Sequence, residues 1–166
     1  RGFATPTAAD LQAAAAGIIG EYHLTRHGAL PAIVEPHWRL TNNPFYARRQ
    51  CVDFFWQRTT PADIGGAPAQ VLTPTAQLLH LAMHLYLHHG GGHLLWLFDL
   101  ALLMVQEQQP WEWAALGRQA QRLGVLRCVQ QAIEDVRALW NLPAAAHAWT
   151  ALASVRPDLS ERAEWW

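Results

Sequence analysis

Apolar residues recur along most of this chain at the three- and four-residue spacing of a buried helix face. The pattern predicts a helix from Thr7 or Asp10 to about His27, and a second helix over residues 45–58. From Pro74 onward it predicts helices throughout, over residues 74–89, 93–108, 110–123, 125–140 and 143–153.

Strand-like stretches are few and lie in the first half of the chain. Alternating residues predict a strand over 32–40, and Gly65-Gly66 predicts a tight turn between short strands at 61–64 and 67–72. This order of elements predicts an α+β fold that is predominantly α-helical. We therefore divide the chain into a small α/β region, a helical bundle and a tail that is expected to fray, at residues 1–72, 73–155 and 156–166.

The strand expected at 32–40 carries three polar residues on one face. Glu35, His37 and Arg39 alternate with apolar residues, and the two-residue period of a strand places all three on the same side. An acid, an imidazole and a guanidinium in one row can form a catalytic or binding site. The same row can also be a solvated sheet face on which Glu35 pairs with Arg39.

Three histidines form a stripe on the helix expected over 74–89. His80, His84 and His88 follow one another at intervals of four residues, and two histidines at that spacing can share a zinc ion if further ligands are present. The Glu that follows the first His of a zinc metalloprotease helix is absent, because residue 81 is Leu. Three interpretations stay open: structural hydrogen bonding, contact with a substrate, or a metal site.

Asp99 is an acid within the strongly apolar helix expected over 93–108. A carboxylate buried there needs a partner, because an unpaired buried charge is costly. Antiparallel packing around the glycines at 90–92 would place residue 99 opposite residue 84. We therefore predict a buried hydrogen bond between Asp99 and His84.

The composition excludes several classes of protein. Hydrophobic residues make up 51% of the chain and charged residues 15%, which is typical of a folded globule. The net charge of -1 gives no basic surface for nucleic acid. No signal peptide is visible, and the most apolar run, 94–105, is too short to span a bilayer. Because Cys51 and Cys128 match no metal-binding spacing, we expect a cytoplasmic protein with two buried, reduced thiols.

Three segments, taken in order, resemble motifs of a known family. Residues 35–40 (Glu-Pro-His-Trp-Arg-Leu) are similar to its acid-x-His-Trp strand, and residues 72–88 to its helix with two histidines four apart. Residues 95–99 are similar to its Trp-x-x-Asp helix, with Trp111 or Trp113 opening the next helix. Together they resemble the uncharacterised nucleotidyltransferase family of the DNA polymerase β-like superfamily, a family found in bacteria. The resemblance extends from the first residue to about residue 142.

This resemblance implies a mechanism and a set of site residues. Enzymes of the superfamily hold two Mg²⁺ ions between three carboxylates. The ions activate an acceptor hydroxyl and neutralise the negative charge that develops as pyrophosphate leaves a nucleoside triphosphate. Glu35 matches the third carboxylate, and His37 matches a histidine of the family. We expect Arg39, His84 and His88 to face the substrate, while the resemblance leaves the nucleotide and the acceptor open.

One part of the family pattern is missing. The chain contains no Asp-x-Asp and no glycine-rich phosphate turn before a strand, and Arg1-Gly2-Phe3 matches the segment shortly after the family's Asp-x-Asp strand. We therefore expect a truncated nucleotidyltransferase that is inactive alone, because a single carboxylate cannot hold two Mg²⁺ ions. A sheet edge exposed where strands are missing would favour self-association. Two alternatives stay open: a non-catalytic helical binding or scaffolding module, and a histidine-rich metal-binding protein.

Overall fold

A computed structural model describes residues 3–4, 6–16, 20–41, 46, 52–106 and 110–164. The described residues form helices and two small antiparallel sheets, so the expected α+β, mostly helical fold is confirmed. Arg1, Gly2 and Cys51 lie outside the described residues. So does most of the first half of the helix expected over 45–58. Cys128 is a buried free thiol, as expected.

The first helix, α1 (Ala8–Ala15), begins where a capping box closes its first turn. Thr7 Oγ1 accepts from the backbone N–H of Asp10, and the Asp10 carboxylate accepts from the backbone N–H of Thr7. The prediction that this helix extends to His27 is wrong, because residues 24–26 are a strand. Pairing with a distant segment here overrides the local helical spacing.

The first sheet joins β1 (Leu24–Arg26) to β2 (Ala32–Val34) in antiparallel register, with Thr25 opposite Ile33. The strand expected over 32–40 is therefore shorter than predicted. Pro36 has no N–H for the ladder, and beyond it the pairing continues only as an isolated bridge between Glu21 and His37.

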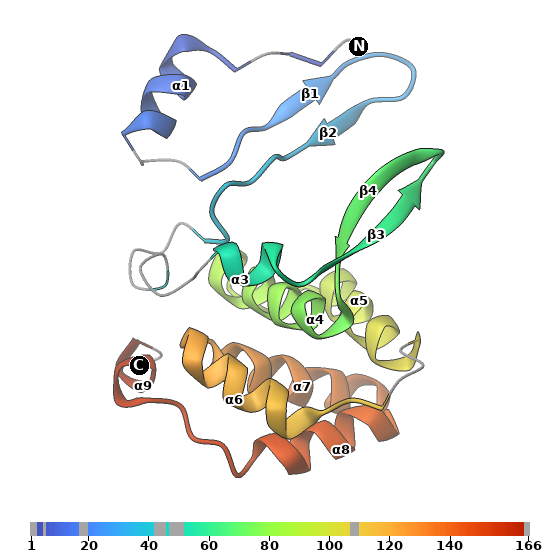
Figure 1. Cartoon of the computed structure of the whole chain (residues 1–166), viewed down its shortest axis with the longest axis vertical. Helices are drawn as coiled ribbons and strands as arrows, with labels where there is room; N and C mark the ends of the chain where they lie inside the picture. The colour runs from blue at the N-terminus through green and yellow to red at the C-terminus, as the bar shows by residue number, and fades with distance from the viewer. Residues whose placement is uncertain are drawn as a thin grey trace.

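The second sheet is the predicted hairpin. After the short helix α3 (Val52–Trp56), β3 (Thr59–Ile64) pairs along its whole length with β4 (Ala67–Leu72). Gly65 and Gly66 both have positive φ, at 63° and 84°, which is the conformation that a two-residue hairpin turn requires. The hairpin projects from the body of the molecule (Figure 1).

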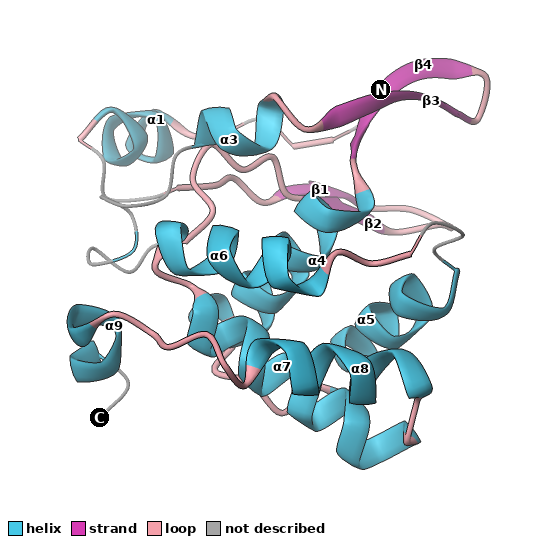
Figure 2. Ribbon diagram, turned by 60° about the horizontal axis from the view of Figure 1, so that its bottom comes forward, coloured by secondary structure: helices cyan, strands magenta, loops and turns pink. Residues whose placement is uncertain are grey.

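The rest of the described chain is helical, and these helices gather on one side of the molecule, with α4 next to the strands (Figure 2). In order they are α4 (Pro74–Met83), the π-helix η1 (His84–His88), α5 (Leu94–Gln106), α6 (Trp113–Leu123), α7 (Leu126–Trp140), α8 (Pro143–Leu152) and α9 (Leu159–Glu164). The five predicted helices are confirmed within a few residues, except that the first of them changes to a π-helix at His84. No helix in the described part of the chain is long and apolar enough to cross a bilayer.

The hydrophobic core lies among the helices that follow the second hairpin. Helix α7 is central, because it contacts α4, α5, α6 and α8. Its buried residues follow the three- and four-residue spacing of one helix face: Leu126, Cys128, Val129, Ala132, Ile133 and Val136. In contrast, α1 buries none of its described side chains. The helices therefore form the stable frame to which the first sheet is attached.

The described part of the tail, residues 156–164, contains the helix α9, so the prediction that this part frays is wrong. Glu161 of α9 is completely buried, and its Oε1 accepts from the backbone N–H of Arg127 at 2.6 Å. Arg127 lies in the first turn of α7, whose N-cap residue is Val125. Valine has no side-chain acceptor, so a carboxylate from the end of the chain caps this helix.

Candidate functional site

Five of the residues singled out in the sequence line one pocket of about 340 Å³. Glu35, His37 and Arg39 come from the segment after β2, and His84 comes from the start of η1. His80 of α4 lines the same pocket. The fold therefore brings together the polar row and the histidine stripe, which are more than forty residues apart in the sequence.

The pairing of two acid-x-His segments builds one wall of this site. Glu21-Tyr22-His23 continues antiparallel to Glu35-Pro36-His37, beyond the end of the first sheet. The His37 Nδ1 lies 2.8 Å from Glu21 Oε2, and the His23 Nε2 lies 3.7 Å from Glu35 Oε1. Each acid thus faces the histidine of the other segment.

Sequence reasoning did not identify Glu21 as a site residue. Its side chain is only 16% exposed, and its Oε1 lies 3.5 Å from His23 Nε2 and 3.7 Å from His88 Nε2. Three imidazoles, including that of His37, therefore surround one carboxylate. The repeated acid-x-His pattern in the sequence was a signal that could have found Glu21, because antiparallel strands place such repeats opposite each other.

The histidine stripe packs against this carboxylate through stacked rings. The ring of His84 is stacked on the ring of His88, with centroids 5.1 Å apart and an angle of 6° between the planes. The centroid of the His37 ring lies 5.9 Å from that of His88. A π-turn holds more residues than an α-turn, so a residue four places on lies more nearly above the first. The backbone hydrogen bond from His89 N–H to His84 O spans five residues and shows this wider turn.

Burial keeps the inner imidazoles of the stripe neutral at neutral pH. Burial is the main cause that lowers the pKa of His84 to about 4, followed by the neighbouring imidazoles of His89 and His80. Burial, and then His37, also lower the pKa of His80. Neutral imidazoles can donate one hydrogen bond and accept another, so they present polar groups to the pocket without charge.

The predicted buried pair of Asp99 and His84 is wrong. Asp99 is exposed, because α5 turns Leu97, Leu100, Ala101 and Met104 toward the core and leaves position 99 on the opposite face. The His84 Nε2 instead lies 2.8 Å from the His89 Nε2, and Trp96 occupies the place expected for Asp99. The π-helix and the glycine turn shift the register of the two helices.

Two tryptophans border the pocket with accessible surface. Trp38 is 37% exposed and packs on Tyr22 with ring centroids 4.7 Å apart, while Trp56 is 66% exposed. Trp38 therefore does not belong to the buried core. Trp96 packs against the core and lies against His89, with centroids 3.7 Å apart.

The donor groups of the site do not fit a pair of Mg²⁺ ions. Within the described residues, no group of three or more His, Cys, Asp or Glu side chains is arranged to hold a metal ion. Mg²⁺ prefers oxygen ligands in an octahedral arrangement, whereas Glu35 faces the imidazole of His23. The same finding leaves the histidine-rich metal-binding interpretation without a ligand set among the described residues.

Comparison with known proteins gives a match to one family model. No curated protein and no solved structure matches it. The model of the family described as "Uncharacterised nucleotidyltransferase" matches residues 7–141, which span both acid-x-His segments, the histidine stripe and α5. The chain therefore belongs to the uncharacterised nucleotidyltransferase family.

Proposed function

We propose that this chain is part of an enzyme that transfers a nucleotidyl group from a nucleoside triphosphate to an acceptor, and that the chain alone is inactive. The observation that carries the proposal is the convergence of Glu35, His37, Arg39 and His84 on one pocket in a member of a nucleotidyltransferase family. The absence of any Asp-x-Asp from the sequence supports the inactivity. The bacterial cytoplasm is the location that we propose for it.

The proposed roles follow from the chemistry of the pocket. Glu35 has a side chain that is 45% exposed, so its carboxylate is accessible to a ligand. Arg39 is the cation of the pocket and suits a phosphate, which guanidinium groups bind through paired hydrogen bonds. The exposed ring of Trp56 offers a face on which a nucleobase can stack. Glu21 holds His37 through Nδ1, which orients the ring that lines the pocket.

In the superfamily that the chain resembles, Mg²⁺ binds the triphosphate and neutralises the leaving pyrophosphate, and we propose the same ion for the reaction of the complete enzyme. The described residues do not supply its ligands, so no step is assigned to it in this chain. Glu35 remains the residue of the chain that matches a family carboxylate.

A label-transfer assay tests the proposal. The purified chain is incubated with α-labelled nucleoside triphosphates, Mg²⁺ and a panel of hydroxyl-bearing acceptors, and no transfer of label is expected. The assay is repeated after addition of the Asp-x-Asp half of a complete family member. Activity gained in this mixture should then be lost in the Glu35→Gln variant and kept in the Glu134→Gln variant, whose carboxylate on α7 lines neither this pocket nor its neighbour.

Label transfer by the chain alone would contradict the proposed inactivity. Equal activity of the complemented Glu35→Gln variant would contradict the role of Glu35. Binding of nucleotide to the chain, without transfer under either condition, would favour the non-catalytic helical binding module.

A further inference from the structure

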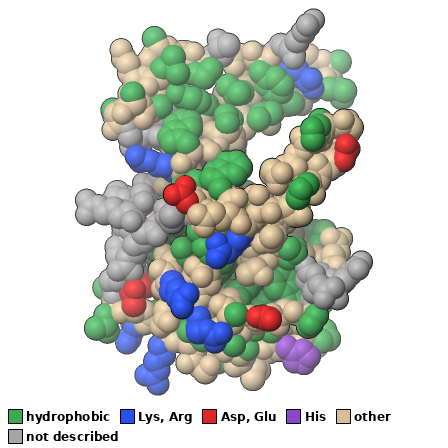
Figure 3. Space-filling view, in the orientation of Figure 1, with side chains coloured by type: hydrophobic (Ala, Val, Ile, Leu, Met, Phe, Trp, Pro, Cys, Tyr) green, Lys and Arg blue, Asp and Glu red, His purple; other side chains and the backbone are tan. Residues whose placement is uncertain are grey.

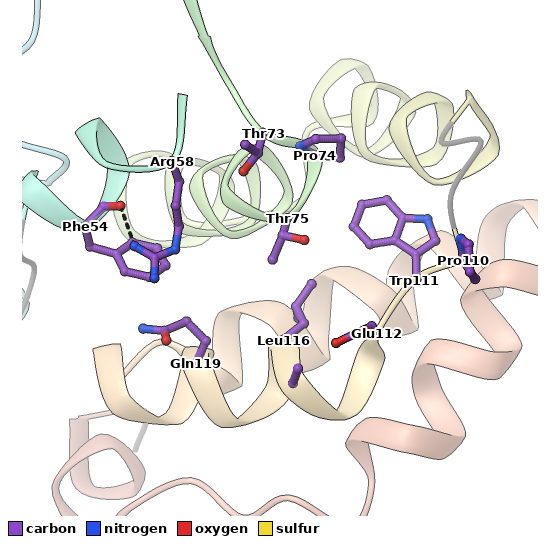
Figure 4. Close-up of a pocket in the computed structure, with 11 residues that line it drawn as sticks. Phe54, Arg58, Thr73, Pro74, Thr75, Pro110, Trp111, Glu112, Leu116 and Gln119 are labelled. Atoms are coloured by element: carbon purple, nitrogen blue, oxygen red, sulfur yellow. Dashed lines mark hydrogen bonds between the residues drawn. The ribbon is translucent and has the colours of Figure 1, made fainter. Parts of the chain in front are cut away.

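A second, larger pocket of about 520 Å³ lies away from the histidines (Figure 4). It opens between α3, the first turn of α4 and the first turn of α6. Its volume is in the range of pockets that hold small molecules. Neither the polar row nor the histidine stripe contributes to it.

This pocket and the histidine-lined pocket lie on opposite sides of a thin wall. In three pairs of consecutive residues, the first residue named here lines the larger pocket and the second lines the histidine-lined pocket. The pairs are Phe54 and Phe55, Arg58 and Thr59, and Thr73 and Leu72. The rings of Phe54 and Phe55 meet edge to face, with centroids 5.1 Å apart. The second pocket is therefore a separate site that shares a wall with the first.

One end of the second pocket carries a positive charge that is held in place. The Arg58 guanidinium lies 3.8 Å from the centroid of the Phe54 ring, and its Nη1 donates to the Phe54 carbonyl at 3.0 Å. A guanidinium has five N–H donors, so this contact leaves others for a ligand. The amide of Gln119 lies on the same side of the pocket (Figure 4).

The other end is aromatic and acidic. Trp111 is stacked on Trp113, with centroids 4.8 Å and planes 14° apart, so its ring is fixed in position. Glu112 and Leu116 lie between Trp111 and Gln119 along the lower side of the pocket in Figure 4. The order across the pocket is therefore a cation with an amide, a middle formed by Leu116 and Thr75, and an indole beside a carboxylate.

We propose that this pocket binds a small aromatic monocarboxylate that carries a hydroxyl or ammonium group at its far end. The carboxylate pairs with Arg58 and Gln119, the ring lies between Leu116 and Thr75, and the far group donates to Glu112. A ligand with a second negative charge is disfavoured, because that charge would meet Glu112 without a further cation in the pocket.

Isothermal titration of the chain with p-coumarate tests this proposal. This probe has one carboxylate, one ring and one phenolic hydroxyl, and binding is expected. Its amide should bind at least about tenfold more weakly, because a charge-assisted hydrogen bond to Arg58 is lost. Cinnamate, which lacks the hydroxyl, should also bind more weakly than p-coumarate.

Variants locate the bound probe. Arg58→Gln and Gln119→Ala should each weaken p-coumarate binding, and Gln119→Ala removes no contact that holds α3. Arg118→Ala is the matched control, since this exposed residue neighbours Gln119 but does not line the pocket. His84→Ala, in the other pocket, should leave the affinity unchanged.

The thermal unfolding midpoint of each variant shows that it is folded before titration. Absence of p-coumarate binding, equal affinity for the amide, or unchanged affinity in both Arg58→Gln and Gln119→Ala would overturn the proposal. Loss of binding in His84→Ala alone would place the probe in the histidine-lined pocket and would overturn it as well.

Discussion

His84 lies among the imidazoles of His37, His80, His88 and His89, and it remains neutral because protonation would place a charge in a partly buried cluster of like groups. A neutral ring can stack, donate and accept, which the parallel contact with His88 requires. Protonation of His84 together with a neighbouring ring would place two like charges in contact. The arrangement therefore depends on pH through the residue at its centre.

We expect the stability of the protein to fall as the pH decreases from about 6.5 toward 4, in part because of His84. In the unfolded chain its imidazole takes up a proton near the ordinary pKa of 6.5, whereas in the folded protein the pKa is lowered to about 4. Over that interval the unfolded state binds more protons, so the free energy of unfolding decreases. Below pH 4 the contribution of His84 no longer changes.

Urea unfolding at a series of pH values measures this effect. The His84→Gln variant should lose less stability than the native chain between pH 6.5 and 4, because the group with the lowered pKa has been removed. His147→Gln, at an exposed position on α8, should follow the native curve. Identical slopes for the native chain and His84→Gln would contradict the assignment.

Glu161 shows how one distant carboxylate can complete a helix. Replacement by Ala removes the acceptor for the Arg127 N–H and leaves a void at a fully buried position. We expect Glu161→Ala to lower the free energy of unfolding by about 1–3 kcal/mol. The exposed neighbour Arg162→Ala should change it by less than about 0.5 kcal/mol. Chemical denaturation monitored by circular dichroism gives both values, and equal effects would contradict the capping role.

At the scale of elements, features specified by neighbouring residues could be predicted from the sequence. The hairpin follows from Gly65-Gly66, and the first turns of α4 and α8 follow from Pro74 and Pro143. Features that depend on distant contacts could not be predicted. The strand at 24–26 exists through pairing with 32–34, so its helical spacing was misleading.

The π-helix ends at a glycine turn whose middle position is sterically constrained. Gly90, Gly91 and Gly92 all have positive φ, at 72°, 82° and 75°. A Cβ atom at Gly91 would lie 2.6 Å from Cε1 of Tyr86. A Cβ atom built on Gly90 or on Gly92 would have no neighbouring atom within 4 Å. The Tyr86 hydroxyl donates to Asp135 of α7, so the ring is held in place.

We expect Gly91→Ala to destabilise the protein by about 1–3 kcal/mol more than Gly90→Ala or Gly92→Ala. All three variants share the cost of a positive φ, so the difference isolates the clash with Tyr86. Thermal unfolding of the three variants under one set of conditions provides the comparison. Equal losses would show that Tyr86 moves aside freely and does not hold the end of the π-helix.

At the scale of the molecule, the candidate site was only partly predictable. The members of the polar row and of the histidine stripe could be singled out from the sequence, because the alternation around Glu35 and the four-residue spacing of the histidines are local patterns. The partner of His37 could not be found in this way, since Glu21 is brought near by strand pairing. The position of Asp99 depends on a shift in helix register that the π-helix introduces.

The outer edge of β2 is the part of the molecule from which we predict self-association. On the other side of this sheet, the backbone N–H of Ala4 donates to Thr25 O of β1. Ile33 and Val34 of β2 are 65% and 48% exposed, and hydrophobic side chains gather over this layer (Figure 3). Among the described residues β2 pairs with β1 alone, and an apolar strand with one open edge is a template for pairing with another chain.

Sedimentation velocity at rising protein concentration tests this prediction. The apparent mass of the native chain should increase with concentration, and Ile33→Lys should suppress the increase because a charge on the strand opposes edge pairing. Leu159→Lys is the matched control, since Leu159 is 80% exposed but lies on α9. A constant monomer mass, or equal suppression by both variants, would contradict pairing through β2.

The wall shared by the two pockets has a thermodynamic consequence. Phe54 and Phe55 touch and face opposite cavities, so a ligand that displaces one ring acts on the surroundings of the other. Any such effect is reciprocal, because linkage requires each ligand to change the affinity of the other by the same factor. A carboxylate bound beside Arg58 would then regulate nucleotide binding beside Arg39, and the nucleotide would regulate the carboxylate equally.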